Sequence, residues 1–278
     1  MNMKFTKMHG LGNDFMVIDG INQHLNLNSQ QIALLAHRNT GVGFDQCLII
    51  ERATRNDVDF NYRIFNADGS EVGQCGNGAR CLALFAKHHG LTTKNKLKVA
   101  TKTTTMNLYI NEDDSVSVDM GQPHLDPQQI PLLAPQQAAT YPLQLNNNQQ
   151  LEIHAVNVGN PHAVLIVDDI FNAPVADWGR QISLHKEFPE QTNAGFMQII
   201  SPHHLRLRVY ERGCGETLAC GSGAVAAAVI GRLYYHMDNP ITVSLRGGDL
   251  VINWPNINEP VLLTGPAIFV YEGTLELF

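Results

Sequence analysis

The chain has 278 residues, of which 44% are hydrophobic and 16% are charged, and its formal net charge is −7. This composition is typical of a globular protein with one large core or two ordinary ones, and the absence of a Lys/Arg cluster argues against nucleic acid or anionic lipid as a partner. No run of about 18 apolar residues could span a membrane and the N-terminal stretch lacks the apolar core of a signal peptide, so we expect a cytoplasmic protein.

The N-terminal segments predict strands, turns and one helix. Strands are expected at residues 4–8 and 15–19, separated by a turn-rich loop that contains two glycines and Asn13. Residues 29–38 predict a helix with Ser29 as its N-cap, and residues 47–51 predict a strand. Asn13 has two readings, since its amide could either shape the turn or bind a ligand.

Two later stretches are copies of one pattern. Residues 61–79 read NYRIFNADGSEVGQCGNGA and residues 206–224 read RLRVYERGCGETLACGSGA. At a constant offset of 145 (220 − 75), the aligned identities are Arg63 with Arg208, Glu71 with Glu216, Cys75 with Cys220, Gly76 with Gly221, Gly78 with Gly223 and Ala79 with Ala224. Each copy begins as an alternating strand and ends in Cys-Gly-(Asn/Ser)-Gly-Ala.

Each of these motifs is followed by an alanine-rich apolar run, at residues 80–87 and 225–233, that predicts a helix packed on a sheet. Cys75 and Cys220 should therefore lie where the chain turns into a helix. The N–H groups and positive dipole end of a helix favour an anion there, either a thiolate or a bound carboxylate. The glycines would let the backbone approach such a ligand closely.

The repeat extends upstream of the cysteines. Gly12-Asn13 corresponds to Gly159-Asn160, and Gly-Phe-Asp-Gln ending at Gln46 corresponds to Gly-Phe-Met-Gln ending at Gln198. Because three motifs recur in the same order, duplication is the economical explanation.

The rest of the chain predicts strands. They are expected at residues 96–102, 105–111 and 115–120, and again at 163–167, 241–245, 249–253, 261–263 and 267–276. The Pro-, Gln- and Asn-rich residues 121–150 are the least patterned, so we place the connection between the halves there and expect the Gln-rich part, 128–150, to be loosely constrained. The expected architecture is two α+β halves with antiparallel sheets.

If the two halves pack face to face about an approximate two-fold axis, Cys75 and Cys220 should confront each other across a cleft. Two opposed thiols suit the inversion of a stereocentre, because one group removes a proton from one face while the other delivers a proton to the opposite face. A thiol with an ordinary pKa of about 8.5 can exist as thiol and thiolate near neutral pH, especially at a helix N-terminus. Backbone N–H groups at Gly76-Asn77 and Gly221-Ser222 could hold an α-carboxylate while charge builds on the α-carbon. The repeat therefore indicates a racemase or epimerase.

Other interpretations of the cysteines are weaker. Because the protein is expected in the reducing cytoplasm, its five cysteines should be free thiols rather than a disulfide framework. The two Cys-x5-Cys spacings fall outside those usual for zinc, so we expect no metal site. Cys47, Cys81 and Cys214 are interpreted as small buried hydrophobic residues.

His162 could be structural or functional, and Glu211 and Arg212 could be an exposed ion pair or part of a site.

At these residues the sequence resembles the diaminopimelate epimerase family, cofactor-independent enzymes that interconvert LL- and meso-diaminopimelate for lysine and peptidoglycan synthesis. The resemblance covers essentially the whole chain. Its motifs are HGLGNDF at 9–15, FNADG at 65–69, CGNGARC at 75–81, GNPH at 159–162, YERG at 210–213, GET at 215–217 and ACGSGA at 219–224. Together these motifs are highly specific, although Cys-Gly-x-Gly alone would be weak.

The resemblance implies roles for particular residues. It implies that Cys75 and Cys220 are the two bases, that His162 and Glu211 adjust their pKa values, and that Tyr271 lies at a homodimer contact. The implied contacts to the substrate diaminopimelate are Asn13, Gln46, Asn66, Gly76, Asn77, Asn160, Asn193, Glu211, Arg212, Gly221 and Ser222. No cofactor, whether pyridoxal phosphate or metal, is implied.

The family fold implies two pseudo-symmetric domains, each a mostly antiparallel sheet around a helix. Because that family returns its last strand to the first domain, residues 1–120 with 265–278 should form the N-terminal domain and residues 121–264 the C-terminal domain. Two departures from the family pattern are Cys214, where a small residue is common, and Ser222, which replaces a frequent threonine but keeps the hydroxyl.

Two alternatives stay open at this point. A proline or hydroxyproline racemase would resemble this family in its two cysteines, but Arg212 and several Asn side chains favour a substrate with a distal carboxylate and ammonium. Related isomerases with a single carboxylate base are disfavoured because both cysteines are present. A thiol redox protein, in which Cys75 and Cys220 form a regulatory disulfide, is the other class.

Overall fold

The computed structural model describes residues 2–23, 26–73, 75–146 and 148–276. The chain divides into two compact units, one made of Met1–Asp119 with Gly265–Phe278 and the other of Met120–Thr264. Position 1 of the predicted N-terminal domain and positions 277 and 278 of its predicted last segment lie outside the described residues.

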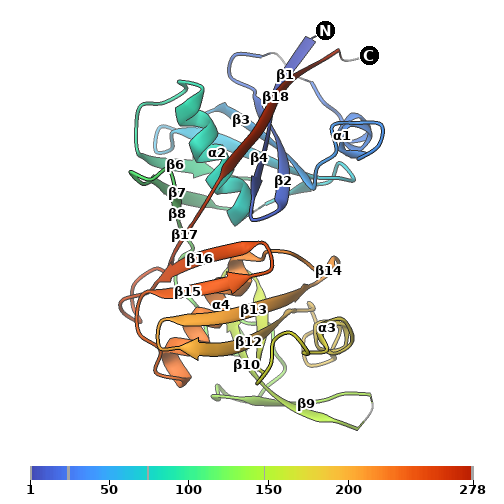
Figure 1. Ribbon diagram of the computed structural model, residues 1–278, viewed down its shortest axis with the longest axis vertical. Helices are drawn as coiled ribbons and strands as arrows, with labels where there is room; N and C mark the ends of the chain where they lie inside the picture. Colours follow the sequence, from blue (N-terminus) through green and yellow to red (C-terminus); the bar gives the residue numbers. More distant parts are fainter. Residues whose placement is uncertain (1, 24–25, 74, 147, 277–278) are drawn as a thin grey trace. The chain divides into compact units, whose positions relative to one another are not determined.

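The first unit contains eleven of the described elements (Figure 1). They are β1 (Asn2–Gly10), β2 (Asn13–Asp19), α1 (Ser29–Ala36), β3 (Gln46–Arg52), β4 (Phe60–Asn66), β5 (Glu71–Val72), α2 (Gly76–His88), β6 (Lys96–Ala100), β7 (Thr105–Ile110), β8 (Val116–Asp119) and β18 (Ile268–Glu276).

The second unit has the same order of elements, except that its flanking strand comes first in the chain instead of last. Its elements are β9 (Tyr141–Gln144), β10 (Gln150–Asn157), β11 (Pro161–Ile166), α3 (Val175–Ser183), β12 (Asn193–Ser201), β13 (His204–Glu211), β14 (Gly215–Glu216), α4 (Gly221–Tyr234), β15 (Ile241–Leu245), β16 (Gly248–Asn253) and β17 (Leu262–Gly265).

Strand pairing repeats between the units. In the first unit β1 pairs with β2, β3 with β4, β6 with β7 and β7 with β8, all antiparallel, whereas β2–β3 and β4–β6 are parallel. In the second unit β11–β12 and β13–β15 are the parallel pairs, and β10–β11, β12–β13, β15–β16 and β16–β17 are antiparallel. The mostly antiparallel sheets are as predicted. The parallel pairs arise where a helix connects two neighbouring strands.

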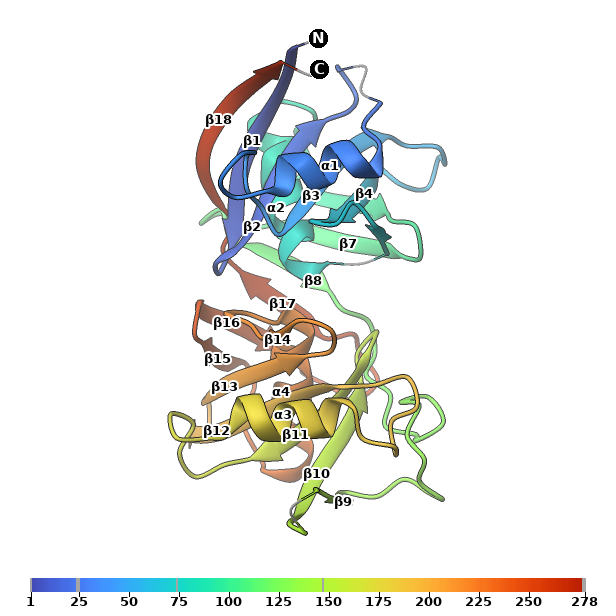
Figure 2. The same ribbon diagram turned by 90° about the vertical axis from the view of Figure 1, so that its right-hand side faces the viewer.

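Each unit packs its sheet around one central helix. Helix α2 contacts β1, β2, β3, β7 and β8, and α4 contacts β10, β11, β12, β13, β15 and β16. In α4, residues 223–231 are all buried, as the alanine-rich sequence predicts. The shorter helices α1 and α3 contact β3 and β12–β13 respectively (Figure 2). The architecture is the predicted α+β fold with two similar halves.

The N-cap predicted for the first helix is wrong by one residue. Asn28, not Ser29, caps α1: its side chain accepts a hydrogen bond from the Gln31 N–H at 2.9 Å, and its own N–H donates to the Gln31 side chain at 3.0 Å. This reciprocal pair is a capping box, which fixes the start of the helix. The helix also ends at Ala36, two residues before the predicted end.

The Gln-rich segment is not loosely constrained. Tyr141 and Leu143 on β9 are buried, together with Ile130, Leu132 and Leu145, in the core cluster of the second unit. Strand β9 pairs antiparallel with β10, just as β18 pairs antiparallel with β1 in the first unit. The segment therefore supplies the strand that flanks the first strand of the duplicated half.

Among the described residues, none of the helices has the length and apolar character that crossing a bilayer demands.

The buried side chains of the Gln-rich segment give a direct test. Leu143 is 1% exposed within the core cluster, so Leu143→Ala should lower the free energy of unfolding by about 2–5 kcal/mol, measured by urea denaturation. Leu133 lies in the same segment but is 62% exposed, so Leu133→Ala should stay within about 0.5 kcal/mol of the wild type. Equal effects of the two substitutions would contradict the placement of this segment in the core.

Candidate active site

The two repeated cysteines cap the central helices. Cys75 is the N-cap of α2 and Cys220 is the N-cap of α4, each in an extended conformation with φ of −154° and −128°. The Cys75 sulfur accepts a hydrogen bond from the Gly78 N–H at 3.3 Å, and the Cys220 sulfur accepts one from the Gly223 N–H at 3.4 Å. The predicted position of both thiols at a helix N-terminus is confirmed.

The glycines of these motifs are also needed for packing inside their own units. A Cβ on Gly78 would collide with the Tyr62 hydroxyl and approach Leu48 at 3.2 Å. A Cβ on Gly223 would lie 2.9 Å from Val209 and 3.3 Å from the Cys220 sulfur. The first turn of each helix can pack this closely on its sheet only with glycine at that position.

An ion pair holds the hairpin that precedes each cysteine. Arg63 on β4 donates from Nε to Glu71 on β5 at 2.9 Å, and Arg208 on β13 donates from Nε to Glu216 on β14 at 2.7 Å. All four residues are matched by the repeat offset of 145. The repeated Arg and Glu therefore fix the strand pair from which the chain leads into the cysteine.

We call Cys75, Asn13, Asn77, Gln46 and Asn66 the first cysteine site. The Asn13 Oδ1 atom lies 4.0 Å from the Cys75 sulfur and accepts a hydrogen bond from the Asn77 amide at 3.3 Å. Gln46 and Asn66 are register partners on β3 and β4, and the Gln46 amide donates to Asn66 Oδ1 at 3.0 Å. The structure thus brings Asn13 and Asn77 to the Cys75 thiol and pairs Gln46 with Asn66 on β3 and β4.

Charged groups fix Asn13. Its amide donates to Asp45 at 2.9 Å, and Arg38 donates to Asp45 at 2.7 Å and to Asp14 at 2.9 and 3.0 Å. Burial raises the pKa of Asp14, but hydrogen bonds from Arg38 and Lys7 outweigh it and lower the pKa to about 2. Asp14 is therefore ionised at neutral pH and keeps the loop in place.

The second cysteine site comprises Cys220, Ser222, His162, Asn160, Asn193, Glu211 and Arg212. His162 is fully buried, and its Nε2 atom lies 3.0 Å from Ser222 Oγ, 3.1 Å from Asn160 Oδ1 and 3.3 Å from Asn193 Nδ2. Ser222 Oγ in turn lies 3.6 Å from the Cys220 sulfur. The structure therefore connects His162 to the thiol through the Ser222 hydroxyl.

Glu211 and Arg212 do not form the exposed ion pair that was one reading of the sequence. Glu211 accepts a hydrogen bond from the Thr217 hydroxyl at 2.6 Å and is hydrogen-bonded to Cys220. The Arg212 N–H donates to Asn193 Oδ1 at 2.9 Å, and its guanidinium donates to the Glu190 carbonyl at 3.0 Å. Both residues belong to the second cysteine site.

The family model for diaminopimelate epimerase matches residues 5–125 and 154–270. A diaminopimelate epimerase of Legionella pneumophila strain Philadelphia 1 is 65% identical over 275 residues, 99% of each chain. The enzyme of Nitrosospira multiformis is 52% identical over 277 residues, 100% of this chain and 99% of that one.

The chain belongs to the diaminopimelate epimerase family.

A solved structure outside the diaminopimelate epimerase family shares its fold. The hydroxyproline epimerase of Agrobacterium vitis, with bound trans-4-hydroxy-L-proline, superposes with a TM-score of 0.68 at 11% identity, covering 99% of this chain and 92% of that one. At this identity the likeness concerns the fold alone.

The electrostatics of the two cysteine sites differ in this member of the diaminopimelate epimerase family. Burial and the charge of Glu211 raise the pKa of Cys220 well above its usual range, against hydrogen bonds from Ser222 and Gly223. Burial also raises the pKa of Glu211. Position 211 minus the offset of 145 is 66, so the first site has the neutral Asn66 where the second has Glu211. Glu211 is hydrogen-bonded to Cys220, whereas the matching position of the first site has an amide side chain.

The remaining cysteines are divided by burial. Cys47 and Cys81 are fully buried, and burial raises the pKa of each to about 12, as expected for small hydrophobic residues. Cys214 is exposed, which corrects its interpretation as buried: it lies in the turn between β13 and β14.

Three side chains near the cysteines were not predicted from the sequence. Thr217 holds Glu211, and Tyr62 and Arg80 are buried beneath the first turns of α2. A signal for two of them was present in the repeat, because the aligned partners of Tyr62 and Arg80 are the apolar Leu207 and Val225 at the same offset.

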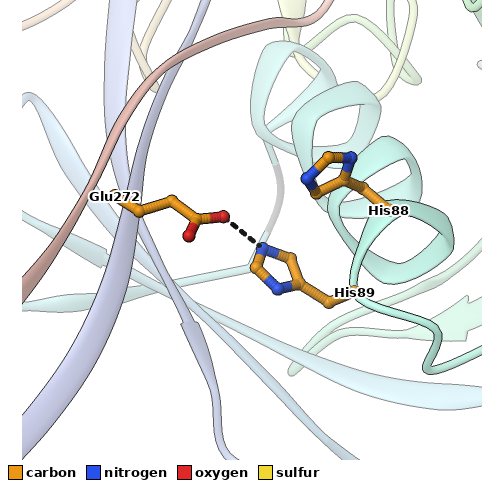
Figure 3. Close-up of side chains that lie close together, drawn as sticks. All are labelled: His88, His89 and Glu272. Atoms are coloured by element: carbon orange, nitrogen blue, oxygen red, sulfur yellow. Dashed lines mark ion pairs between the residues drawn. The ribbon is translucent and has the colours of Figure 1, made fainter.

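Within the described part of the chain, one group outside the cysteine sites combines possible metal ligands. His88 and His89 at the end of α2 and Glu272 on β18 have ligand atoms within 4.8 Å of one another, and His89 pairs with Glu272 at 3.5 Å (Figure 3). His89 Nε2 also lies 3.1 Å from the Thr6 hydroxyl. Helix α2 has 13 residues, so this cluster is about 20 Å from Cys75 and is not part of the first cysteine site.

His162 predicts a pH dependence of stability. Burial, with the positive charge of Arg212, lowers the pKa of His162 from 6.5 to about 3. Between these values the unfolded chain binds a proton that the folded chain does not, so the stabilising contribution is complete above pH 6.5 and is lost as pH falls toward 3. Urea denaturation from pH 7 to 4.5, above the range in which Asp14 titrates, should show this loss as about 2 to 3 kcal/mol.

His162→Asn removes the group with the largest effect and should reduce this pH dependence. A smaller slope should remain, because burial also lowers the pKa of His154 and of His89. His203 is exposed in the same unit, so His203→Asn is the matched control and should keep the wild-type slope. A wild-type slope in His162→Asn would show that another group causes the pH dependence.

Proposed function

We propose that the protein interconverts LL- and meso-2,6-diaminopimelate, with Cys75 and Cys220 as the two bases. The observation that carries the proposal is the matched pair of cysteine N-caps in a chain of this family. Two equivalent thiols in duplicated frames match a reaction that is symmetric about its α-carbon.

The protons balance as follows. A thiolate takes the α-proton from one face of the substrate, and the S–H bond that forms replaces the C–H bond that breaks. The opposite thiol gives its proton to the other face of the carbanion, so the stereocentre is inverted and the two sulfurs have exchanged protonation states. No electron is transferred and no cofactor is required in the proposed reaction.

The helix N-termini stabilise the charge that develops. Because α2 and α4 begin at Gly76 and Gly221, the N–H groups of their first residues are not used by the helix itself. Such N–H groups and the helix dipole favour an α-carboxylate and the negative charge that builds as the α-proton leaves. We assign this role to Gly76 with Asn77 and to Gly221 with Ser222.

The resting protonation states follow from the environments of the thiols. Cys220 is 4% exposed and hydrogen-bonded to Glu211, so it holds its proton and acts first as the acid. Cys75 is partly exposed, and the repeat position that Glu211 occupies in the second site is occupied in the first by the neutral Asn66. Cys75 therefore acts as the thiolate base toward the LL substrate. The two sulfurs return to these protonation states by exchanging protons with solvent before the next LL molecule reacts, and their roles are reversed for the meso-to-LL reaction.

Neutral His162 acts through Ser222. With a pKa of about 3 it carries no charge at neutral pH, so it cannot attract a thiolate as a cation would. Its contact to Ser222 Oγ at 3.0 Å orients that hydroxyl toward the Cys220 sulfur. We propose that His162 adjusts the pKa of Cys220 through the Ser222 hydroxyl, and that Glu211 raises it through its negative charge.

The remaining residues of the two cysteine sites bind the substrate in this proposal. Arg212 is suited to a carboxylate because guanidinium offers five N–H donors in a fixed plane. Amide groups suit the ammonium and the second carboxylate of diaminopimelate. The proposed contacts are Asn13, Gln46, Asn66, Asn77, Asn160, Asn193, Glu211, Arg212 and Ser222, with the backbone of Gly76 and Gly221.

We also propose that the enzyme acts in the cytoplasm as a homodimer with Tyr271 at the contact. Tyr271 on β18 is 46% exposed, and Ile268 and Val270 on the same strand are 45% and 54% exposed. A row of exposed apolar side chains on one strand suits a contact with a second copy. Sedimentation of the wild type as a monomer at micromolar concentration would contradict this part of the proposal.

Replacement of either base tests the function. Cys75→Ala and Cys220→Ala should each reduce the turnover of LL-diaminopimelate by on the order of a hundred- to ten-thousand-fold while keeping the wild-type circular dichroism spectrum, because each direction needs both sulfurs. Cys214→Ala is the matched control, since this thiol is exposed and caps no helix, and should keep full activity. Full activity in either base variant would overturn the two-base assignment.

Substrate identity is tested in the same assay. The wild type should act on LL-diaminopimelate and leave L-proline and trans-4-hydroxy-L-proline unchanged, because neither offers the distal carboxylate and ammonium that the polar residues are proposed to bind. Faster turnover of a proline substrate would replace the proposed substrate while keeping the two cysteines.

A further inference from the structure

One cation is buried completely in the first unit. Arg80 on α2 is 0% exposed, and its Nε donates to the Pro266 carbonyl at 3.2 Å. Within the part of the chain that the structure describes, its Nη1 and Nη2 atoms have no hydrogen-bond partner. A buried guanidinium without a carboxylate is costly, so the position calls for an explanation.

The guanidinium lies beside the first turn of α2. Long helical side chains point back toward the N-terminus, which directs Arg80 over Gly76 and Asn77. A Cβ on Gly10 would be 3.0 Å from Arg80 Nη2 and 3.4 Å from Asn77 Cβ, so the arginine head and Asn77 lie against the same point of β1. Cys75 caps this turn, and Arg80 interacts with it electrostatically.

The neighbouring thiols differ in their ability to balance this charge. Cys81 is fully buried and its pKa is raised to about 12, so it remains a neutral thiol near pH 7. Cys75 is partly exposed and caps a helix, where a thiolate is favoured. Burial lowers the pKa of Arg80, but a guanidinium starts from an ordinary pKa above 12 and keeps its proton at neutral pH. Of these two thiols, only Cys75 is placed to become the counter-charge.

The duplicated half lacks this cation. Position 80 plus the offset of 145 is 225, where the chain has Val225 in the corresponding turn of α4. The second cysteine site instead has the acid Glu211 beside Cys220. The repeat is therefore broken by an added positive charge at one cysteine and an added acid at the other.

We propose that Arg80 is a positioning residue that holds Cys75 in its thiolate form, through its buried positive charge beside the first turn of α2. The inference rests on the proposed function, in which Cys75 is the first base. Its bond to the Pro266 carbonyl fixes the guanidinium in place. Because no carboxylate pairs with it among the residues that the structure describes, its charge is left to the thiolate. Arg80 acts through Cys75 and need not touch the substrate.

The test measures the ionisation of Cys75 directly. Wild-type protein and Arg80→Met are alkylated with iodoacetamide between pH 6 and 10, and the rate at each cysteine is read by mass spectrometry. Met has a similar length without the charge, so the midpoint of the Cys75 profile should move up by at least one pH unit, which is a roughly tenfold loss of thiolate below the midpoint. The profile of the exposed Cys214 on the same molecules should not move.

Two variants keep the test decisive if Arg80→Met does not fold. Arg80→Lys keeps the charge and should keep the wild-type Cys75 midpoint within about half a pH unit. Arg80→Gln keeps a donor for Pro266 without the charge and should shift the midpoint as Met does. Arg52→Met removes an exposed positive charge from the same unit and should leave the midpoint unchanged. A wild-type Cys75 midpoint in folded Arg80→Met or Arg80→Gln would overturn the proposal.

Activity separates this proposal from the proposed function. For Arg80→Met, kcat/KM should fall about tenfold at pH 7 and recover as the pH rises, because more Cys75 ionises. If the wild type does not epimerise diaminopimelate, the proposed function fails, whereas the alkylation profiles still decide whether Arg80 controls the Cys75 thiolate.

Discussion

A cysteine sulfur that accepts an N–H from the first turn of a buried helix is the interaction on which both sites depend. Cys75 and Cys220 are held this way by Gly78 and Gly223, and the same glycines let each helix pack closely on its sheet. The thiol is thus fixed by backbone geometry, in a position where the helix dipole favours negative charge. The same Cys-Gly-x-Gly motif thus serves both to position the thiol and to let the helix pack on its sheet, which explains why the motif occurs twice.

The duplicated frames are alike in structure and different in charge. Both have the Arg–Glu pair across the preceding hairpin, but only the second has Glu211 and only the first has Arg80. A symmetric fold can place two thiols, yet a proton must be on one of them and absent from the other for turnover to begin. Charged residues at positions that break the repeat supply that difference.

Much of this was accessible from the sequence, because the information was local or repeated. The constant offset of 145 located both helix-capping cysteines, and strand alternation located most strands. Strand β9 was missed because it has four residues and contains Pro142, which weakens a strand signal. The capping box of Asn28 was missed because Ser29 is also a good N-cap residue. The burial of Arg80 and the Thr217–Glu211 bond depend on tertiary packing, which local patterns do not encode.

The central claim, that two different sulfurs donate and accept the proton, is tested most directly by the isotope content of substrate and product early in the reaction. Reduced wild-type protein is given LL-diaminopimelate in deuterium oxide, and NMR follows both stereoisomers during the first few per cent of conversion. With two bases, the meso product should contain deuterium at the inverted carbon while the remaining LL substrate keeps its protium. Deuterium entering the LL substrate as fast as the product would indicate a single exchanging base and contradict the account.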